Sequence, residues 1–248
     1  MLDVKNLIVF FENAIALNDF SFQVNDGEFV GVVGPNSAGK TTLMNTLSGL
    51  IIDMQIKEKR KGGERITVYG SLVYQGRDIT HTKPSERVKR GIVLSRERHP
   101  IFPESSVLEN LKIAGFLRSK QEIRDGIDFA LQLFPALTAL KKKKAGFLSG
   151  VEQLMLAIGM ALIVKPQLLL LDEPLLGLSP MMQSTLIDAI VSLNKQRGIT
   201  VVLCEQFARP VFPVIDRGYI LENGMLTLMG TGEELMQNPE IKAAYFGI

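Results

Sequence analysis

The chain has 248 residues, of which 46% are hydrophobic and 22% are charged, and 28 basic against 26 acidic residues leave a net charge of +2. This composition excludes a disordered or fibrous protein, and it gives no electrostatic basis for binding nucleic acid. A lone cysteine, Cys204, with two histidines, His81 and His99, forms neither an internal disulfide nor a metal-ligand pattern, so a reducing, cytoplasmic setting is expected. The longest apolar run, 154–164, is too short to span a bilayer.

The first fifty residues predict strands followed by a helix. Short β-type runs at 7–11, 20–24 and 29–33 are separated by polar turns, and apolar residues at helical spacing predict a helix over 40–50 that ends near Gly49. Two basic stretches, 57–65 and 141–144, are interpreted as solvated surface, the first of them as a loop.

The rest of the chain predicts a group of helices and then alternating strands and helices. Apolar positions recur every three or four residues between 107 and 163, which indicates packed helices. The following elements are strands at 168–171 and 200–203, a helix at about 181–196, a hairpin around Asn223-Gly224, and a last helix opened by a capping box of Thr231 and Glu234. This order predicts an α/β fold in which helices cover both faces of a parallel sheet.

The most specific motif lies between the predicted strand 29–33 and the helix that begins at Lys40. Its residues fit the pattern of a phosphate-binding loop, G-x-x-x-x-G-K-S/T: Gly34, Pro35, Asn36, Ser37, Ala38, Gly39, Lys40, Thr41 and Thr42. Glycines let backbone amides wrap around a polyphosphate, and the helix N-terminus adds partial positive charge. We expect the Lys40 ammonium at the β- and γ-phosphates and the Thr41 hydroxyl on Mg²⁺.

An acidic pair, Asp172-Glu173, ends the predicted strand 168–171. Carboxylates at the carboxyl ends of parallel strands face the crevice where ligands bind in α/β sheets. We assign Asp172 to Mg²⁺ and Glu173 to the attacking water. In isolation, the same pair would also fit ordinary carboxylates at the end of a strand.

Residues 148–153, Leu-Ser-Gly-Val-Glu-Gln, precede this acidic strand and are similar to the signature of ATP-binding cassette (ABC) ATPases, and the chain resembles that family over its whole length. The resemblance implies a P-loop NTPase core with an N-terminal antiparallel β subdomain and a helical insert. It implies one domain over 1–248, with a nucleotide-binding core at 1–96 and 165–248 and a helical subdomain at about 97–164. It also implies ATP and Mg²⁺ as cofactors and a second cassette as partner, whose bound nucleotide would meet Ser149 and Gly150.

Other positions are matched to the family one at a time. Phe11 falls where the family has an aromatic residue stacked on adenine, although a core phenylalanine would fit equally. Glu97 falls at the loop that offers Gln or Glu to metal and water, and a plain surface glutamate is its alternative. Gln206 replaces the usual switch histidine at the γ-phosphate. Further departures are Val151 for a signature glycine, Met160 for arginine, Leu154 for a polar residue, Ser37 for a loop glycine, and an apparent insertion at 53–70.

Within the family, the stretches 101–104, 133–135, 155–159 and 217–224 are similar to ATPase subunits of branched-chain amino acid uptake systems. The expected function is therefore ATP hydrolysis for an importer of hydrophobic amino acids, at the cytoplasmic face of the membrane and in complex with permease subunits. Because the chain's own phosphate loop is intact while Val151 alters its signature, the second cassette is expected to be a different chain. The alternatives are a soluble ABC ATPase without a membrane partner and a weakly hydrolysing regulatory cassette.

Overall fold

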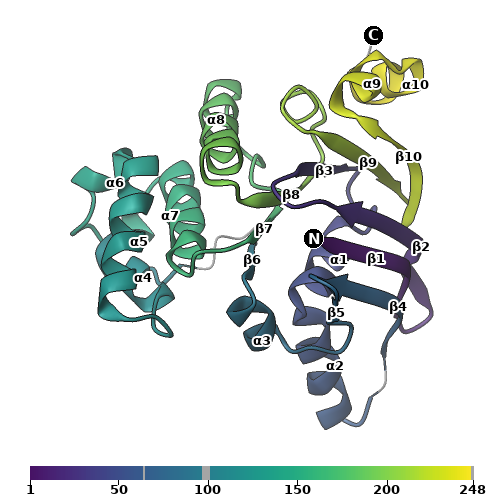
Figure 1. Ribbon diagram of the computed structural model, residues 1–248, viewed down its shortest axis with the longest axis horizontal. Coiled ribbons are helices and arrows are strands. Elements are labelled where there is room, and N and C mark those ends of the chain that lie inside the picture. Colours follow the sequence, from purple (N-terminus) through teal and green to yellow (C-terminus); the bar gives the residue numbers. More distant parts are fainter. Residues whose placement is uncertain (64, 97–100, 247–248) are drawn as a thin grey trace.

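The computed structural model describes residues 1–63, 65–96 and 101–246, and its strands form two sheets (Figure 1). The smaller sheet is antiparallel in the order β2-β1-β4-β5, with β1 at Leu2–Phe11, β2 at Ala14–Val24, β4 at Ile66–Tyr74 and β5 at Arg77–Asp78. Buried Leu2 and Val4 extend β1 beyond the predicted run 7–11, because they face the same apolar core as Leu7 and Val9.

The larger sheet has six strands in the order β10-β9-β3-β8-β7-β6. Its five parallel strands are β3 (Phe29–Val33), β6 (Ile92–Ser95), β7 (Leu168–Asp172), β8 (Thr200–Glu205) and β9 (Arg217–Glu222), and β10 (Met225–Thr231) pairs antiparallel with β9. Strands β3, β7 and β8 are buried along their whole length, as expected for parallel strands covered on both faces. The predicted α/β fold with a parallel sheet is confirmed.

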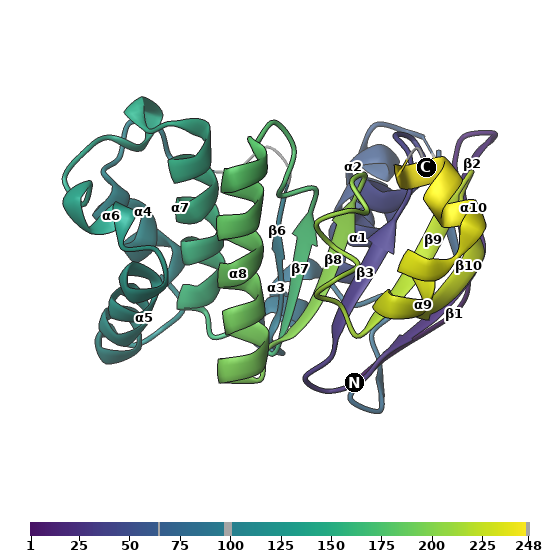
Figure 2. The ribbon, with the colours of Figure 1, turned by 90° about the horizontal axis from the view of Figure 1, so that it is seen from above.

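Helices pack on both faces of the six-stranded sheet (Figure 2). Helix α1 (Lys40–Ser48) and the antiparallel sheet share one apolar core with Val30 and Val32. The other face is covered by α7 (Gly150–Ile163) and α8 (Pro180–Arg197), beyond which lie α4 (Val107–Ala114), α5 (Lys120–Leu133), α6 (Ala136–Ala139) and the 3₁₀ turn η1 (Ala145–Phe147). The helices α4 to α7 confirm the predicted helical insert, while the subdomain boundary at 97–164 stays a prediction.

The C-terminal segment contains the short helices α9 (Gly232–Gln237) and α10 (Pro239–Ile241) and the π-helical turn η2 (Lys242–Phe246). The predicted capping box at the start of α9 is present: the Thr231 hydroxyl accepts from the Glu234 amide, and the Glu234 carboxylate accepts from the Thr231 amide. In the parts of the chain that the structure describes, no helix is both long and apolar enough to cross a membrane.

The chain turns sharply after α1, at Gly49, and this corner corrects one prediction. Helix α2 (Leu50–Arg60) begins directly after Gly49, whose φ is 84°, so the loop predicted at 57–65 is wrong for its first four residues. Ile51 and Ile52 are buried and anchor the first turn of α2. Its last turn carries Lys57, Lys59 and Arg60, and basic side chains stabilise the C-terminal end of a helix.

The corner is filled by Arg87, from α3 (Pro84–Lys89), which is fully buried. Its guanidinium donates to the backbone carbonyls of Thr46, Leu47, Ile79, Thr80 and Thr82. Burial lowers the pKa of Arg87 to about 10, and its charge is compensated by carbonyl dipoles at the C-terminal end of α1. Arg87 therefore holds the end of α1 opposite the phosphate loop.

Candidate functional site

The predicted phosphate loop joins the carboxyl end of β3 to the N-terminus of α1. The loop is held to the sheet by a hydrogen bond from the Gly34 amide to the Glu205 carbonyl (3.1 Å). Gly39 caps α1 with φ 108°, and a Cβ added there would lie 2.5 Å from the Ala16 carbonyl oxygen, so only glycine fits. Because the first amides of a helix have no intrahelical acceptor, those at the start of α1 are available to an anion.

Lys40 lies at the centre of this loop and is 3% exposed. Its ammonium donates to the carbonyls of Gly34 (2.8 Å) and Pro35 (2.7 Å) and forms an ion pair with Glu173 Oε1 at 2.9 Å. Glu173 follows β7 in a left-handed conformation, with φ 47°, and its amide donates to the Cys204 carbonyl. The structure thus brings the loop lysine and the second residue of the acidic pair into direct contact.

Thr41 and Asp172 form a second contact across the same site. The Thr41 hydroxyl donates to Asp172 Oδ1 at 3.4 Å, and Asp172 is the buried last residue of β7. Hydroxyl and carboxylate oxygens are the ligands that Mg²⁺ takes in nucleotide sites, with the rest of its shell from phosphate and water. The described residues contain no group of three or more His, Cys, Asp or Glu side chains able to hold a metal by themselves. The donor set therefore fits a magnesium ion that arrives with a nucleotide.

These residues surround a recess of about 160 Å³. It is lined by Ala16, Ser37, Gly39, Lys40, Thr41, Thr42 and Glu173. Phe11, at the end of β1, packs against the apolar core of the antiparallel sheet, and the residue of this hairpin that lines the recess is Ala16. Stacking of Phe11 on adenine stays a prediction.

A buried acid that sequence reasoning missed lies beside this site. Glu205 ends β8 and is 1% exposed; Oε1 accepts from the Leu175 amide (2.7 Å) and Oε2 from the Gln206 amide (3.2 Å). Burial, reinforced by the nearby charge of Glu173, raises the pKa of Glu205 to about 8. The sequence pattern that could have revealed it is a single acidic residue, Glu205, at the end of an otherwise apolar strand. Glu205 connects the segments after β3, β7 and β8 through its carbonyl and carboxylate.

The remaining predicted site residues lie elsewhere or outside the described residues. Ser149 caps α7 in a capping box with Glu152, and Ser149 and Gly150 are exposed at the N-terminus of that helix. A Cβ added at Gly150 would meet nothing within 4 Å, and no residue of α7 lines the recess of the phosphate loop. Gln206 is half-buried directly after β8. Glu97 lies outside the described residues.

A mixed sheet with a phosphate loop before α1 and an acidic pair after β7 defines an ATP-binding cassette, a class of ATP-hydrolysing protein. The family model described as ABC transporter matches residues 17–176, and the chain belongs to this family. The predicted ABC ATPase is thereby confirmed.

Named relatives match the chain over its full length. It is 37% identical to the high-affinity branched-chain amino acid transport ATP-binding protein BraG of Pseudomonas aeruginosa, covering 100% of both chains. It is 34% identical to the probable branched-chain amino acid transport ATP-binding protein LivF of Archaeoglobus fulgidus, covering 100% of this chain and 99% of that one. A crystal structure of the ADP conformation of MJ1267, an ATP-binding cassette of an ABC transporter, superimposes with a TM-score of 0.83 at 26% identity, covering 100% of this chain and 99% of that one.

Proposed function

We propose that this chain is the ATP-hydrolysing subunit of an importer for branched-chain or other hydrophobic amino acids. It would work at the cytoplasmic face of the cell membrane as one half of a cassette dimer. The observation that carries the proposal is that Lys40, Thr41 and Glu173 line one recess, with Asp172 in contact with Thr41. The amino acid class is supported by the printed names of the full-length relatives BraG and LivF.

Each side chain at the recess has one role in this proposal. Lys40 and the amides of residues 38–42 hold the phosphates, and Thr41 and Asp172 hold Mg²⁺, which when bound neutralises charge that develops on the phosphate oxygens. Glu173 orients the attacking water and accepts its proton, while Lys40 keeps this carboxylate beside the loop. Gln206 contributes a neutral amide near the γ-phosphate, and Glu97 a further oxygen to metal and water.

The signature segment supports a dimer of two different cassettes. Ser149 and Gly150 are exposed at the N-terminus of α7 and do not line the recess of their own chain. The Ser149 amide donates to Glu152, so it is the amides that follow it, from Gly150 on, that are available to a nucleotide on a partner. Val151 adds a β-branched side chain beside these amides, which weakens what this chain offers its partner. Val151→Gly should therefore raise turnover only at the site on the partner's phosphate loop. Full ATPase activity of a homodimer of this chain would refute the asymmetry.

Contact with permease subunits is proposed for the apolar surface beside the helical insert. Phe102, Phe116 and Phe147 are 48%, 78% and 71% exposed, and exposed apolar surface of this kind marks protein contacts. Phe102→Asp should uncouple ATP hydrolysis from transport without unfolding the chain. Unchanged coupling in reconstituted transporter would count against this placement.

Hydrolysis is tested by comparing the wild type with Glu173→Gln. We expect kcat to fall by about two to four orders of magnitude, the usual contribution of a positioned acid or base, while nucleotide binding persists. Glu104→Gln, at an exposed glutamate outside the recess, is the control and should keep full activity. Equal turnover in wild type and Glu173→Gln would instead favour a cassette that binds ATP without hydrolysing it.

The transport role needs a separate experiment. Affinity purification from membranes should co-elute permease subunits and a second cassette, and deletion of the gene should abolish uptake of labelled leucine. A chain that hydrolyses ATP but co-purifies with no membrane protein would support the alternative of a cassette without a membrane partner.

A further inference from the structure

A second recess, of about 460 Å³, lies at the edge of the six-stranded sheet opposite the phosphate loop. Gly91 and Gln167, which line it, directly precede β6 and β7, whereas the phosphate loop follows the carboxyl end of β3. Its other lining residues include five basic side chains, Arg77, Lys89, Arg90, Arg118 and Lys165, and no carboxylate. We name it the cationic recess.

Positive charge is concentrated at this recess although the chain as a whole is almost neutral. The chain as a whole has 28 basic against 26 acidic residues, yet five basic residues line one cavity. Two of them have acidic partners: Lys89 pairs with Glu86 (2.8 Å) and Arg118 with Glu122 (3.9 Å). Within the described ranges, Arg77, Arg90 and Lys165 form no ion pair. A cleft lined by one sign of charge concentrates ions of the opposite sign.

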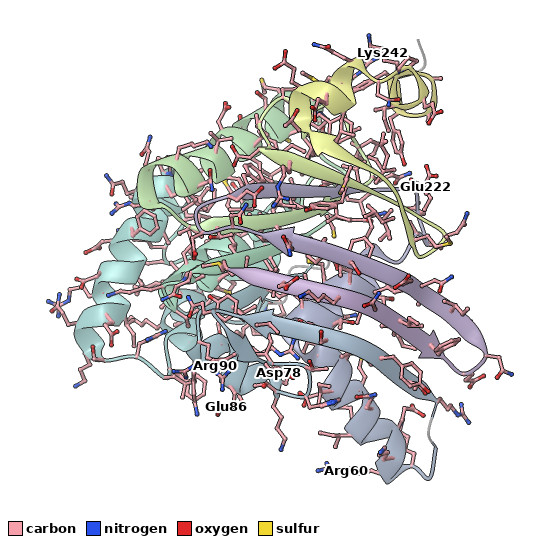
Figure 3. All side chains as sticks on the ribbon, turned by 45° about the vertical axis from the view of Figure 1, so that its right-hand side comes forward. Arg60, Asp78, Glu86, Arg90, Glu222 and Lys242 are labelled. Atoms are coloured by element: carbon pink, nitrogen blue, oxygen red, sulfur yellow. The ribbon has the colours of Figure 1, made fainter. Side chains whose placement is uncertain are left out.

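The basic side chains come from four separate segments of the chain. Arg77 begins β5, Lys89 ends α3 and Arg90 follows it, Arg118 lies between α4 and α5, and Lys165 lies between α7 and β7. In the view of Figure 3, the labels of Arg90 and Glu86 stand near that of Asp78, the last residue of β5. An anion in the recess would therefore link the helical insert, through Arg118, to the nucleotide-binding part of the chain.

The floor of the recess is organised by uncharged hydrogen bonds. The buried Tyr74 hydroxyl (3.4 Å) and the Gln75 side-chain amide (2.5 Å) both donate to Gln167 Oε1, which leaves the Gln167 amide hydrogens as additional donors. Lys165 adopts φ 53°, a left-handed conformation that favours glycine, and it lines this cavity.

We propose that the cationic recess binds a small phosphorylated anion with two or more charges, separately from the nucleotide site. Guanidinium groups match phosphate oxygens in bidentate geometry, and Arg77, Arg90 and Arg118 supply three of them. A bounded cavity walled by four segments fits a compact soluble anion better than the flat surface of a membrane.

The test is calorimetric titration of the full chain with sodium pyrophosphate, without magnesium and at low ionic strength. The wild type should bind two equivalents, one at the phosphate loop and one in the cationic recess. Lys40→Ala should lose the first and keep the second, whereas the double variant Arg77→Ala/Arg90→Ala should weaken the second by about tenfold or more. Arg124→Ala, at an exposed arginine outside the recess, is the matched control and should keep both.

Two results would overturn the proposal. The first is loss of all pyrophosphate binding in Lys40→Ala in a folded protein, which would leave the phosphate loop as the sole site. The second is flotation with vesicles containing phosphatidylglycerol that depends on Arg77 and Arg90 while pyrophosphate fails to bind, which would identify the recess as a lipid contact. Neither result bears on ATP hydrolysis, which Glu173→Gln tests separately.

Discussion

Replacing Glu205 with glutamine should change how the stability of the cassette depends on pH. The pKa of this carboxyl is about 8 in the folded chain, against 4.5 for an ordinary glutamate. Between these values, folding takes up one proton at Glu205, so the free energy of unfolding falls as pH rises. The stabilisation is fully present below about pH 4.5 and is lost as pH rises through 8.

The magnitude follows from proton linkage. One proton bound on folding corresponds to about 1.4 kcal/mol per pH unit, so Glu205 contributes a fall of about 2–3 kcal/mol between pH 5.5 and 7.5. Glutamine is neutral throughout and removes this contribution. Its oxygen still accepts from the Leu175 amide, but its NH₂ group faces the Gln206 amide, so one hydrogen bond of about 1 kcal/mol is lost at every pH.

The assay is urea unfolding of both proteins at pH 5.5, 6.5 and 7.5. The stability of the wild type minus that of Glu205→Gln should fall as pH rises. Glu240→Gln, at an exposed glutamate, should show no such change. A difference that stays constant within about 0.5 kcal/mol, or rises with pH, would refute the burial of a protonated carboxyl at position 205.

Two further changes test the scaffold around the site. Gly34→Ala places a Cβ 2.0 Å from the Leu221 carbonyl oxygen, so it should lower the free energy of unfolding by at least about 1–3 kcal/mol and weaken ATP binding. Gly150→Ala, whose Cβ meets no neighbour, is the control and should be neutral or slightly stabilising in urea unfolding. Arg87→Met leaves buried carbonyls at the end of α1 without their donor, so the free energy of unfolding should fall by about 3–5 kcal/mol in the same assay. A fall below about 1 kcal/mol would show that water replaces the guanidinium.

Local patterns were sufficient to predict the elements that position the nucleotide site. The apolar runs of β3 and β7 and the helical spacing after Lys40 each depend on neighbours in sequence, and their order placed the loop and the acidic pair at the same edge of one sheet. The predicted capping box at Thr231 is equally local.

Features that depend on distant contacts could not be predicted in this way. Arg87 lies within a short polar helix and resembles a solvated side chain, but carbonyls some forty residues earlier in the chain decide its burial. Glu205 is buried by the segments after β3 and β7. The sequence predicts a loop in place of the end of helix α2 because its last four residues, 57–60, are all charged, and its two buried isoleucines are too few to show a period.

The corner at Gly49 divides α1, which carries the phosphate loop at its N-terminus, from α2. A change at the outer end of α2 is therefore expected to leave the phosphate loop in place. Arg87 binds the carbonyls of Thr46 and Leu47 at the far end of α1, so α2 continues the chain beyond this anchor and away from Lys40. The exposed tip at Gly62, where an added Cβ meets nothing within 4 Å, is consequently a suitable point for inserting a fluorescent or affinity tag. A reporter placed there should leave nucleotide turnover intact.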